Sequence, residues 1–373
     1  MSFAQLIALL IPAALCAQVA EFRVRETAGL RRFGYPVRAR FHCEKPAAAL
    51  RLLDDGKTVP AQFTPIGDGA LEIDFSVSLG PFEVRRYRVE EGPGPAPGAG
   101  IDVVEIGEAF QVRYPAGLVF EIPKHVRGFL SLVRWSELTY VGSGSRGFVL
   151  RSKDGAESEV GSSRPPLDSR ILKRGPLSAC LRFEGHESLG QSGTVKTTVE
   201  MEFPRSKSWV EVRWTVEDPD ALVAAMEADV GLLLDGDPVL VDFGAGTMVY
   251  AALRNDSAAL FQADLPSTGP PSWRIDVAGG AYAAGQGNVE GWAHVMDRRR
   301  ATAVAVADFA RSRPVTSDAI FVNSRGRLAI RRDFASTGAR SLAFWLHFVD
   351  MPVHVGAATS PQSMQTPPRV EWE

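Results

Sequence analysis

Hydrophobic and polar residues alternate along much of the chain with a period of two, the spacing of a β-strand that has one buried face. The strongest example covers residues 195–203 and 210–216, in which mostly valine and aromatic residues alternate with threonine and charged residues. The short segment 204–208 separates the two runs, so the pattern predicts a long antiparallel hairpin. Weaker versions of the pattern predict further strands at 50–53, 59–64, 71–75, 302–308 and 342–348.

One segment has the features of a helix. Asp218 is a suitable N-cap, Pro219 suits the first helical position, and the residues up to Glu227 are rich in alanine, leucine and methionine. The alternative is a loop that leads into a strand ending at 232–234. With no other credible helix, the sequence predicts that fewer than about a tenth of the residues are helical, against the usual ~30–35%.

The clearest boundary is residues 92–100, a run of glycine, proline and alanine that sustains neither helix nor sheet. It predicts an all-β protein of two parts. Residues 21–91, with short strands, form a small N-terminal β-barrel or sandwich, and residues 101–360, with longer strands, form a large antiparallel domain. The last segment, 361–373, contains three prolines and is expected to be an extended tail.

The N-terminus has the pattern of an export signal. Residues 3–20 carry no charge and end in small residues, so we expect a signal peptide at 1–20 that is cleaved after Ala17 or Ala20. The protein is then secreted or periplasmic, without a membrane span in the mature chain; the alternative is an N-terminal membrane anchor. In an oxidising compartment Cys43 and Cys180 form one disulfide or remain two buried thiols.

Composition and motifs exclude several classes of function. The 373 residues carry a net charge of -3, which leaves no basic excess for a nucleic-acid backbone. The glycine-rich segment 142–147 fits a dinucleotide-binding fingerprint, but a strand-like run follows it where that fold needs a helix, so we interpret it as a hairpin loop. The six histidines are scattered without the spacing of a metal pair. The sequence therefore predicts neither a metal site nor a cofactor.

Two alternations combine tryptophan with histidine. Strand geometry places Trp292 beside His294, shortly before Arg298, and places Trp345 beside His347, opposite the leucine and phenylalanine face of 342–348. Tryptophan rings stack on the apolar faces of sugars, while histidine and arginine reach hydroxyl and carboxylate groups. We predict these five residues as a carbohydrate site. The alternative is that the rings pack under a second layer of structure.

Six stretches of the chain together resemble one known family: residues 49–63, 145–151, 173–177, 181–186, 214–219 and 291–309. They are similar to the exo-acting rhamnogalacturonan lyases and their YetA-like relatives, which implies a small barrel, a β-supersandwich of the galactose-mutarotase type and then an α/α toroid. The sequence ends at Glu373, where that toroid would begin.

The resemblance implies a ligand, an acidic polysaccharide that contains uronate. One hypothesis is a polysaccharide lyase, because elimination needs a base, here His294, and a cation beside the carboxylate, here Arg298. A second hypothesis is a non-catalytic carbohydrate-binding protein in which Trp292 and Trp345 are the platforms. A third is a structural protein of the cell surface. Without the toroid, half of the expected cleft wall is missing, which favours binding over catalysis.

Overall fold

The computed structural model describes residues 18–95, 98–263, 271–309, 315–335, 340–350 and 360–373. Within these ranges the fold is all-β, as the alternating pattern predicts. The helical segments there are the five-residue helix α1 (Pro361–Gln365) and the 3-10 turn Ala47–Ala49. None of the described helices has the length and apolar character needed to cross a membrane. The predicted signal peptide falls mainly on residues 1–17, outside the described residues.

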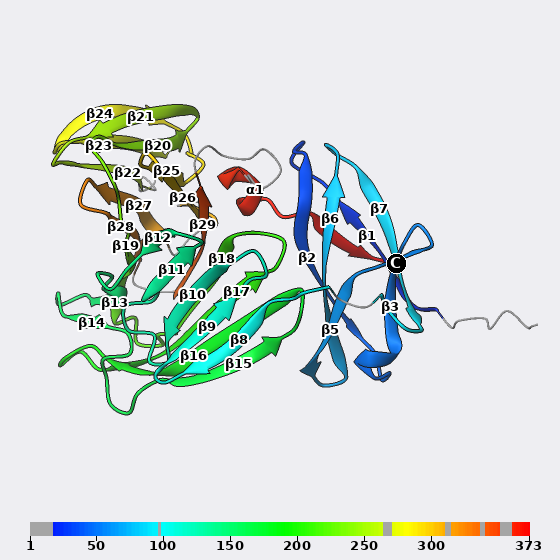
Figure 1. Ribbon diagram of the computed structural model, residues 1–373. Helices are drawn as coiled ribbons and strands as arrows, with labels where there is room; N and C mark the ends of the chain where they lie inside the picture. Colours follow the sequence, from blue (N-terminus) through cyan, green and yellow to red (C-terminus); the bar gives the residue numbers. More distant parts are fainter. Residues whose placement is uncertain (1–17, 96–97, 264–270, 310–314, 336–339, 351–359) are drawn as a thin grey trace, which may run out of the picture.

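Two sheets form the small N-terminal domain, on the right in Figure 1. Apolar positions of their strands face one another, and Phe22, Phe75 and Tyr87 meet in the centre with ring centroids 5.0–5.8 Å apart. The five-stranded sheet has the order β30 (Arg369–Trp372), β1 (Gln18–Arg25), β7 (Val84–Glu91), β3 (Leu50–Asp54) and β4 (Lys57–Val59). The three-stranded sheet has the order β2 (Arg32–His42), β6 (Ala70–Leu79) and β5 (Ala61–Gly67).

Three antiparallel sheets form the large sandwich. The nine-stranded sheet has the order β15 (Asp168–Arg174), β16 (Ser178–Ser188), β17 (Thr194–Pro204), β18 (Trp209–Glu217), β29 (Arg340–Asp350), β26 (Arg300–Val306), β25 (Trp292–Met296), β20 (Val239–Ala245) and β21 (Thr247–Leu253). The eight-stranded sheet has the order β14 (Glu157–Glu159), β13 (Gly147–Ser152), β19 (Val223–Gly231), β28 (Arg327–Phe334), β27 (Val315–Asn323), β22 (Ser257–Ala263), β23 (Ser272–Val277) and β24 (Gly280–Gln286). A five-stranded sheet has the order β12 (Leu138–Val141), β11 (Leu132–Trp135), β10 (Leu118–Pro123), β9 (Ala109–Arg113) and β8 (Asp102–Ile106).

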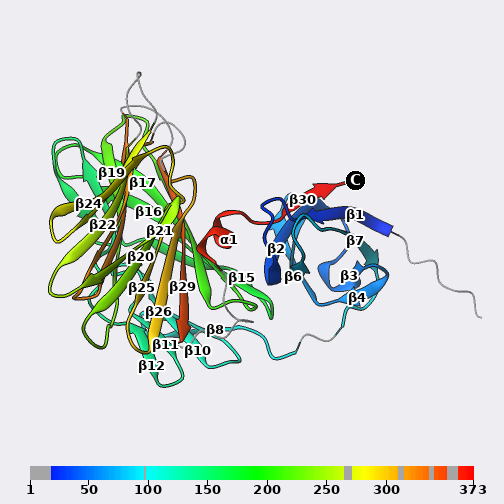
Figure 2. The same ribbon diagram turned by 90° about the horizontal axis from the view of Figure 1, so that it is seen from above.

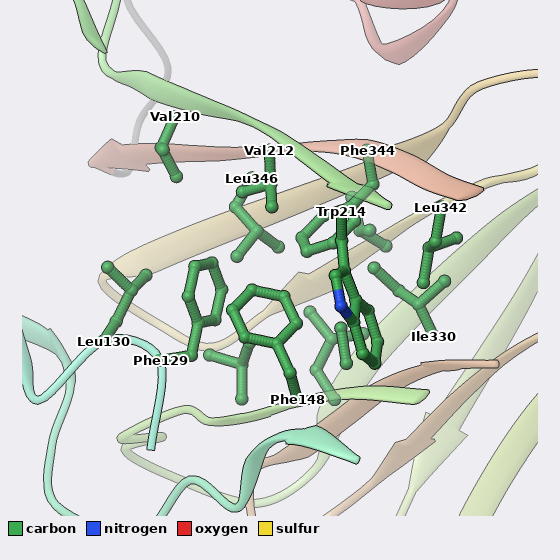
Figure 3. Close-up of a cluster of buried hydrophobic side chains, with 14 of the residues drawn as sticks. Phe129, Leu130, Phe148, Val210, Val212, Trp214, Ile330, Leu342, Phe344 and Leu346 are labelled. Atoms are coloured by element: carbon green, nitrogen blue, oxygen red, sulfur yellow. The ribbon is translucent and has the colours of Figure 1, made fainter. Parts of the chain in front are cut away.

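The core of the sandwich lies between the inner face of the nine-stranded sheet and the other two sheets. Phe344 on β29 meets Phe129, with ring centroids 6.0 Å apart, and Phe148 on β13 meets Trp214 at 4.9 Å. The Trp214 indole N–H donates to the buried Thr197 hydroxyl at 2.8 Å, so this polar group is satisfied inside the core. Figure 3 shows these rings and the leucines of β29 interdigitating between the sheets.

The sequence-predicted hairpin at 195–216 is confirmed as β17 and β18, with Val199 opposite Trp214. The helix predicted from Pro219 to Glu227 is wrong, because β19 occupies most of that segment. The Asp218 carboxylate accepts the backbone N–H groups of Leu222 and Val223, at 2.7 and 2.9 Å, and so closes a tight loop that feeds the strand. The alternative reading, a loop leading into a strand, describes the structure.

The C-terminal segment is not the extended tail expected from its prolines. It forms α1, which packs on β26 and β25, and then β30, which pairs antiparallel with β1, Phe22 opposite Trp372. Arg32 of β2 binds this segment with its side chain. Its guanidinium donates to the Ser363 carbonyl at 2.7 Å and pairs with Glu26 at 2.8 Å, and both side chains of that pair are fully buried. The segment therefore links the sandwich to the small domain, as Figures 1 and 2 show.

The small domain also contacts the sandwich directly. The Gln62 side chain of β5 accepts the N–H groups of Leu177 and Ser178, at 2.9 and 3.1 Å, and donates to the Ser178 carbonyl at 3.0 Å. A Cβ at Gly175 would lie 2.2 Å from this amide, so a larger residue there would displace the Gln62 side chain from these bonds. These bonds fix one edge of the surface on which the functional site lies.

Candidate functional site

The outward face of the nine-stranded sheet carries the sequence-predicted residues. Opposite residues of antiparallel strands share a face. Trp292 on β25 is opposite Ala305 on β26, which is opposite Trp345 on β29. His294 and His347 occupy the next row in the same way, with Ala303 between them. The structure thus brings both tryptophan–histidine pairs to one face, two strands apart.

The second pair is nevertheless buried. Trp345 is 8% exposed and packs with residues of the small domain, and His347 is 1% exposed with its ring edge-on to Trp209 at 5.8 Å. These two residues are therefore not exposed platforms. For them the alternative interpretation holds, because the small domain is the second layer that covers this part of the sheet.

Helix α1 covers the space between the two pairs. The outward residues of β26 are alanines, and the fully buried Met364 of α1 packs in the same cluster as Ala303 and Ala305. The Gln365 amide donates to the Glu290 and Val306 carbonyls at 2.6 and 2.7 Å, which anchors the helix over the strand. The outward face is therefore divided into two areas.

One area holds Trp292 and His294. The His294 Nδ1 lies 2.9 Å from the Oδ1 of Asp242 on β20, and the side chains of these residues are 28% and 5% exposed. The Trp292 ring lies 5.2 Å from the imidazole. It presses on Gly244, where a Cβ would be 2.2 Å from the indole nitrogen. This area is half-buried and keeps a polar group within reach of solvent.

Arg298 does not join His294. The carboxylate of Asp297 accepts the N–H groups of Arg299 and Arg300, at 2.7 and 2.8 Å, and this closes the turn after β25. Arg298 is exposed in the turn, and its side chain runs beside Gly236. The sequence prediction placed the base and the carboxylate-neutralising cation in one site, and the turn directs the cation elsewhere.

The second area is a groove of about 670 Å³ between the small domain and the nine-stranded sheet. Of the five predicted site residues, Trp345 lines it. Its walls carry aromatic and charged side chains that come from both domains and from the C-terminal segment: Tyr35, Arg38, Arg40, Glu72, Asp74, Glu202, Arg205, Trp209, Glu211, Arg213, Trp345 and Trp372.

A buried ion cluster adjoins the groove, and its carboxylates Glu72, Asp74 and Glu202 line the groove wall. The ammonium of Lys173 on β15 lies 2.7 Å from Glu72, 2.9 Å from Asp74 and 2.7 Å from Glu202. Two of these carboxylates belong to the small domain and one to the sandwich. Burial and the neighbouring Glu202 and Glu72 raise the pKa of Asp74 to about 7, against the opposing pull of Lys173. Burial also acts to raise the pKa of Glu72, but Lys173 and Arg40 outweigh it and lower that pKa.

The mouth of the groove is cationic. Arg38 and Arg213 each lie 2.5 Å from Glu211, and Arg40 lies 2.7 Å from Glu72. Arg205, on the turn between β17 and β18, also lines the groove, but no carboxylate of the described residues pairs with it. One guanidinium is therefore left without an acidic partner at the opening.

Comparison with known proteins shows a shared fold. The chain matches a protein in the glycosyl hydrolase family 38 from Enterococcus faecalis, with a TM-score of 0.60, 10% identity and 95% of this chain covered by 47% of that one. It also matches an alpha-mannosidase from Enterococcus faecalis V583, with a TM-score of 0.57, 9% identity and 95% covered by 46%. The chain shares the fold of these two proteins.

The likeness includes the small domain, since 95% of the chain is covered, and the chain spans about half the length of these two solved structures. A galactose mutarotase-like protein from Lactobacillus casei ATCC 334 is also matched, with a TM-score of 0.35, 12% identity and 67% of this chain covered by all of that one. No family model matches, and no curated protein sequence matches. At these identities the likeness describes fold alone.

Other groups lie as follows. Among the described residues, no cluster of histidine, cysteine and acidic side chains is arranged to hold a metal ion. Cys43 and Cys180 are separate thiols. Segment 142–147 connects β12 to β13, two strands of different sheets, so it is a loop but not a hairpin.

Sequence reasoning missed the groove and Asp242. The sequence does contain a signal for both, namely charged residues at the polar positions of strands with alternating hydrophobicity. Asp242 stands between Val241 and Phe243, and Asp74 stands between Ile73 and Phe75. Such alternation shows that a side chain faces away from one core. It does not show that a second domain faces it from the other side.

Proposed function

We propose that this protein is a secreted carbohydrate-binding protein whose groove takes an acidic, uronate-containing polysaccharide of the rhamnogalacturonan kind. The observation that carries the proposal is Arg205, a lining residue of an aromatic groove that pairs with no carboxylate of the described residues. Five cations, four arginines that line the groove and Lys173 of the adjoining ion cluster, face four carboxylates, which leaves one positive charge for a ligand. A planar guanidinium matches a carboxylate with two parallel hydrogen bonds.

Aromatic residues supply the second element of a sugar site. Trp372 lines the groove and is 41% exposed, so a sugar can reach its ring, whereas Trp209, Trp345 and Tyr35 are buried in the groove wall. Sugar rings have apolar faces that stack on an exposed ring of this kind, while their substituents need polar partners. The fold shared with a glycosyl hydrolase family 38 protein and an alpha-mannosidase supports a carbohydrate ligand, and the resemblance to rhamnogalacturonan lyases supports an acidic one.

Binding fits the site better than elimination does. A lyase needs its base and its carboxylate-neutralising cation on one substrate unit. His294 pairs with Asp242 on the far side of α1 from the groove, and Arg298 lies beside Gly236. The groove itself lacks histidine among its described lining residues. We therefore propose that a polysaccharide-lyase-like ancestor left a chain that holds the polysaccharide without cleaving it.

The test is calorimetric titration with two forms of one ligand, rhamnogalacturonan oligosaccharides with free carboxylates and the same oligosaccharides after methyl esterification. The free acid is expected to bind and the ester to bind at least about tenfold more weakly, the loss of one charged hydrogen bond. Arg205→Ala should abolish the difference between the two forms. Arg254→Ala, an exposed arginine on another edge of the sandwich, is the matched control.

The same samples are followed by ultraviolet absorbance for unsaturated product. Binding without product supports the proposal. Release of unsaturated product shows a lyase instead, and the absence of binding to both forms rejects the groove as a polysaccharide site.

A further inference from the structure

The outward face on the other side of α1 has its own arrangement of polar and aromatic groups. Tyr250 on β21 is opposite Asp242 on β20, and Asp242 is opposite His294 on β25. Opposite residues share a face, and three adjacent strands span about 10 Å. This row, with Trp292 two residues along β25 from His294, forms a patch that the groove does not include.

The polar pair at the centre of the patch is held in a fixed orientation. Asp242 is nearly buried and lies 2.9 Å from the Nδ1 of His294. A carboxylate at this distance accepts the Nδ1–H, which leaves the Nε2 of the imidazole to bind a ligand atom. Because the side chain of His294 remains 28% exposed, a hydroxyl group from solvent can reach it.

Aromatic and apolar groups surround the pair. Two of the large hydrophobic side chains exposed at the surface lie here, Tyr250 at 53% and Leu240 at 45% exposure. Trp292 is fixed on the backbone of Gly244, so it offers a rigid ring at low entropic cost. None of the described outward positions of β20, β21 and β25 is a lysine or arginine.

We infer that Tyr250, Asp242, His294 and Trp292 form a second saccharide-binding site, which takes an uncharged sugar ring. The rings of Tyr250 and Trp292 flank the ligand, and the imidazole and the carboxylate bind neighbouring hydroxyl groups. A uronate is disfavoured here because its carboxylate would meet Asp242 without a cation. This inference does not depend on the groove, since α1 separates the two areas.

The experiment uses the full chain and four neutral probes, the methyl glycosides of galactose, mannose, glucose and rhamnose. Saturation-transfer NMR detects contact with the protein, and the ring signals of His294, assigned through His294→Asn, locate it. At least one glycoside is expected to shift the His294 signals and to saturate. Tyr250→Ala, which removes an exposed ring, should weaken that binding roughly three- to tenfold with an unchanged melting temperature.

Phe33→Ala, which removes an exposed ring from the small domain, is the matched control and should change nothing. The inference is overturned if no probe shifts the His294 signals, or if Tyr250→Ala and Phe33→Ala bind equally well. Arg205→Ala keeps the site intact under this inference. Loss of neutral-sugar binding in that variant would place the sugar in the groove and would also overturn it.

Discussion

The ammonium of Lys173 in the sandwich lies 2.9 Å from the carboxylate of Asp74 in the small domain. Both side chains are almost fully buried, and Glu72 and Glu202 complete the cluster. A buried charge network tolerates the loss of its central cation poorly, because Asp74 would keep no ion-pair partner among the described residues, while Glu72 would keep Arg40 and Glu202 would keep Arg38. This contact is therefore one of those that hold the two domains together.

Lys173→Met is expected to lower the free energy of unfolding by about 3–5 kcal/mol at neutral pH. The loss should shrink near pH 5, because carboxylates without their cation take up protons more readily. Urea denaturation at both pH values measures it. The control is Lys196→Met. The ammonium of Lys196 bridges two surface carboxylates, so its removal should lower the free energy of unfolding by no more than about 1 kcal/mol. Equal losses in the two variants would contradict a structural role for the cluster.

The buried pair of Glu26 and Arg32 predicts an acid-sensitive contact. Burial acts to raise the pKa of Glu26, but Arg32 and three backbone N–H groups outweigh it and lower that pKa to about 2. A carboxyl group with a lowered pKa stabilises the fold above its ordinary pKa near 4.5, and this stabilisation is lost as the pH falls toward 2. Glu26→Gln should be less stable than wild type at pH 7 and equal to it near pH 2. A difference that stays constant with pH would refute this.

Lys207 is expected to be an unusually reactive amine. It is buried in the turn between β17 and β18, no carboxylate of the described residues pairs with it, and burial lowers its pKa to about 8. Its acetylation rate should therefore rise to half of its maximum near pH 8. Lys196, whose pKa its two glutamates raise, should still be accelerating above pH 10. Peptide mass spectrometry over a pH series gives both profiles, and identical profiles would count against the prediction.

Replacement of Glu187 by glutamine is expected to stabilise the fold. The Glu187 side chain is fully buried, and one carboxylate oxygen accepts the Gly161 N–H at 2.5 Å while the other has no hydrogen-bond partner among the described groups. Glu187→Gln keeps the acceptor and removes the charge, so the free energy of unfolding should rise by about 1 kcal/mol or more. Glu187→Ala loses the bond and should destabilise the protein. A Gln variant less stable than wild type would contradict this prediction.

The N-terminus of the exported protein is expected at Gln18. Gln18 and Ala20 both pair with β7, so cleavage after Ala20 would remove the first part of β1 whereas cleavage after Ala17 keeps the strand whole. Intact-mass measurement of protein recovered from the medium or periplasm of an expressing bacterium gives the answer. Retention of residue 1 on cytoplasmic protein would refute export.

Local patterns predicted the fold well wherever a strand had one buried face. The hairpin around Val199 and Trp214 is an example, because its alternation distinguishes the core side directly. The same approach mispredicted β19 as a helix. Residues on both faces of β19 are buried, and its run of alanine and methionine suits a helix as well as a strand.

The candidate site was predicted only in part, for a physical reason. Period-two spacing placed Trp292 and Trp345 on one sheet face, as the structure has them. What covers that face depends on contacts between residues far apart in the chain, such as Lys173 with Asp74 and Arg32 with Ser363. No local pattern encodes such contacts, so the sequence alone could not show that Trp292 is partly exposed and Trp345 is buried.

The pairing of β30 with β1 also sets the order in which the molecule can be completed during synthesis. A ribosome makes β1 first and β30 only after all the strands of the sandwich, 102–350, have been synthesised. The edge of β1 therefore stays open through most of translation, although N-terminal domains commonly finish first. Most of the small domain is therefore made first, but its five-stranded sheet is completed last.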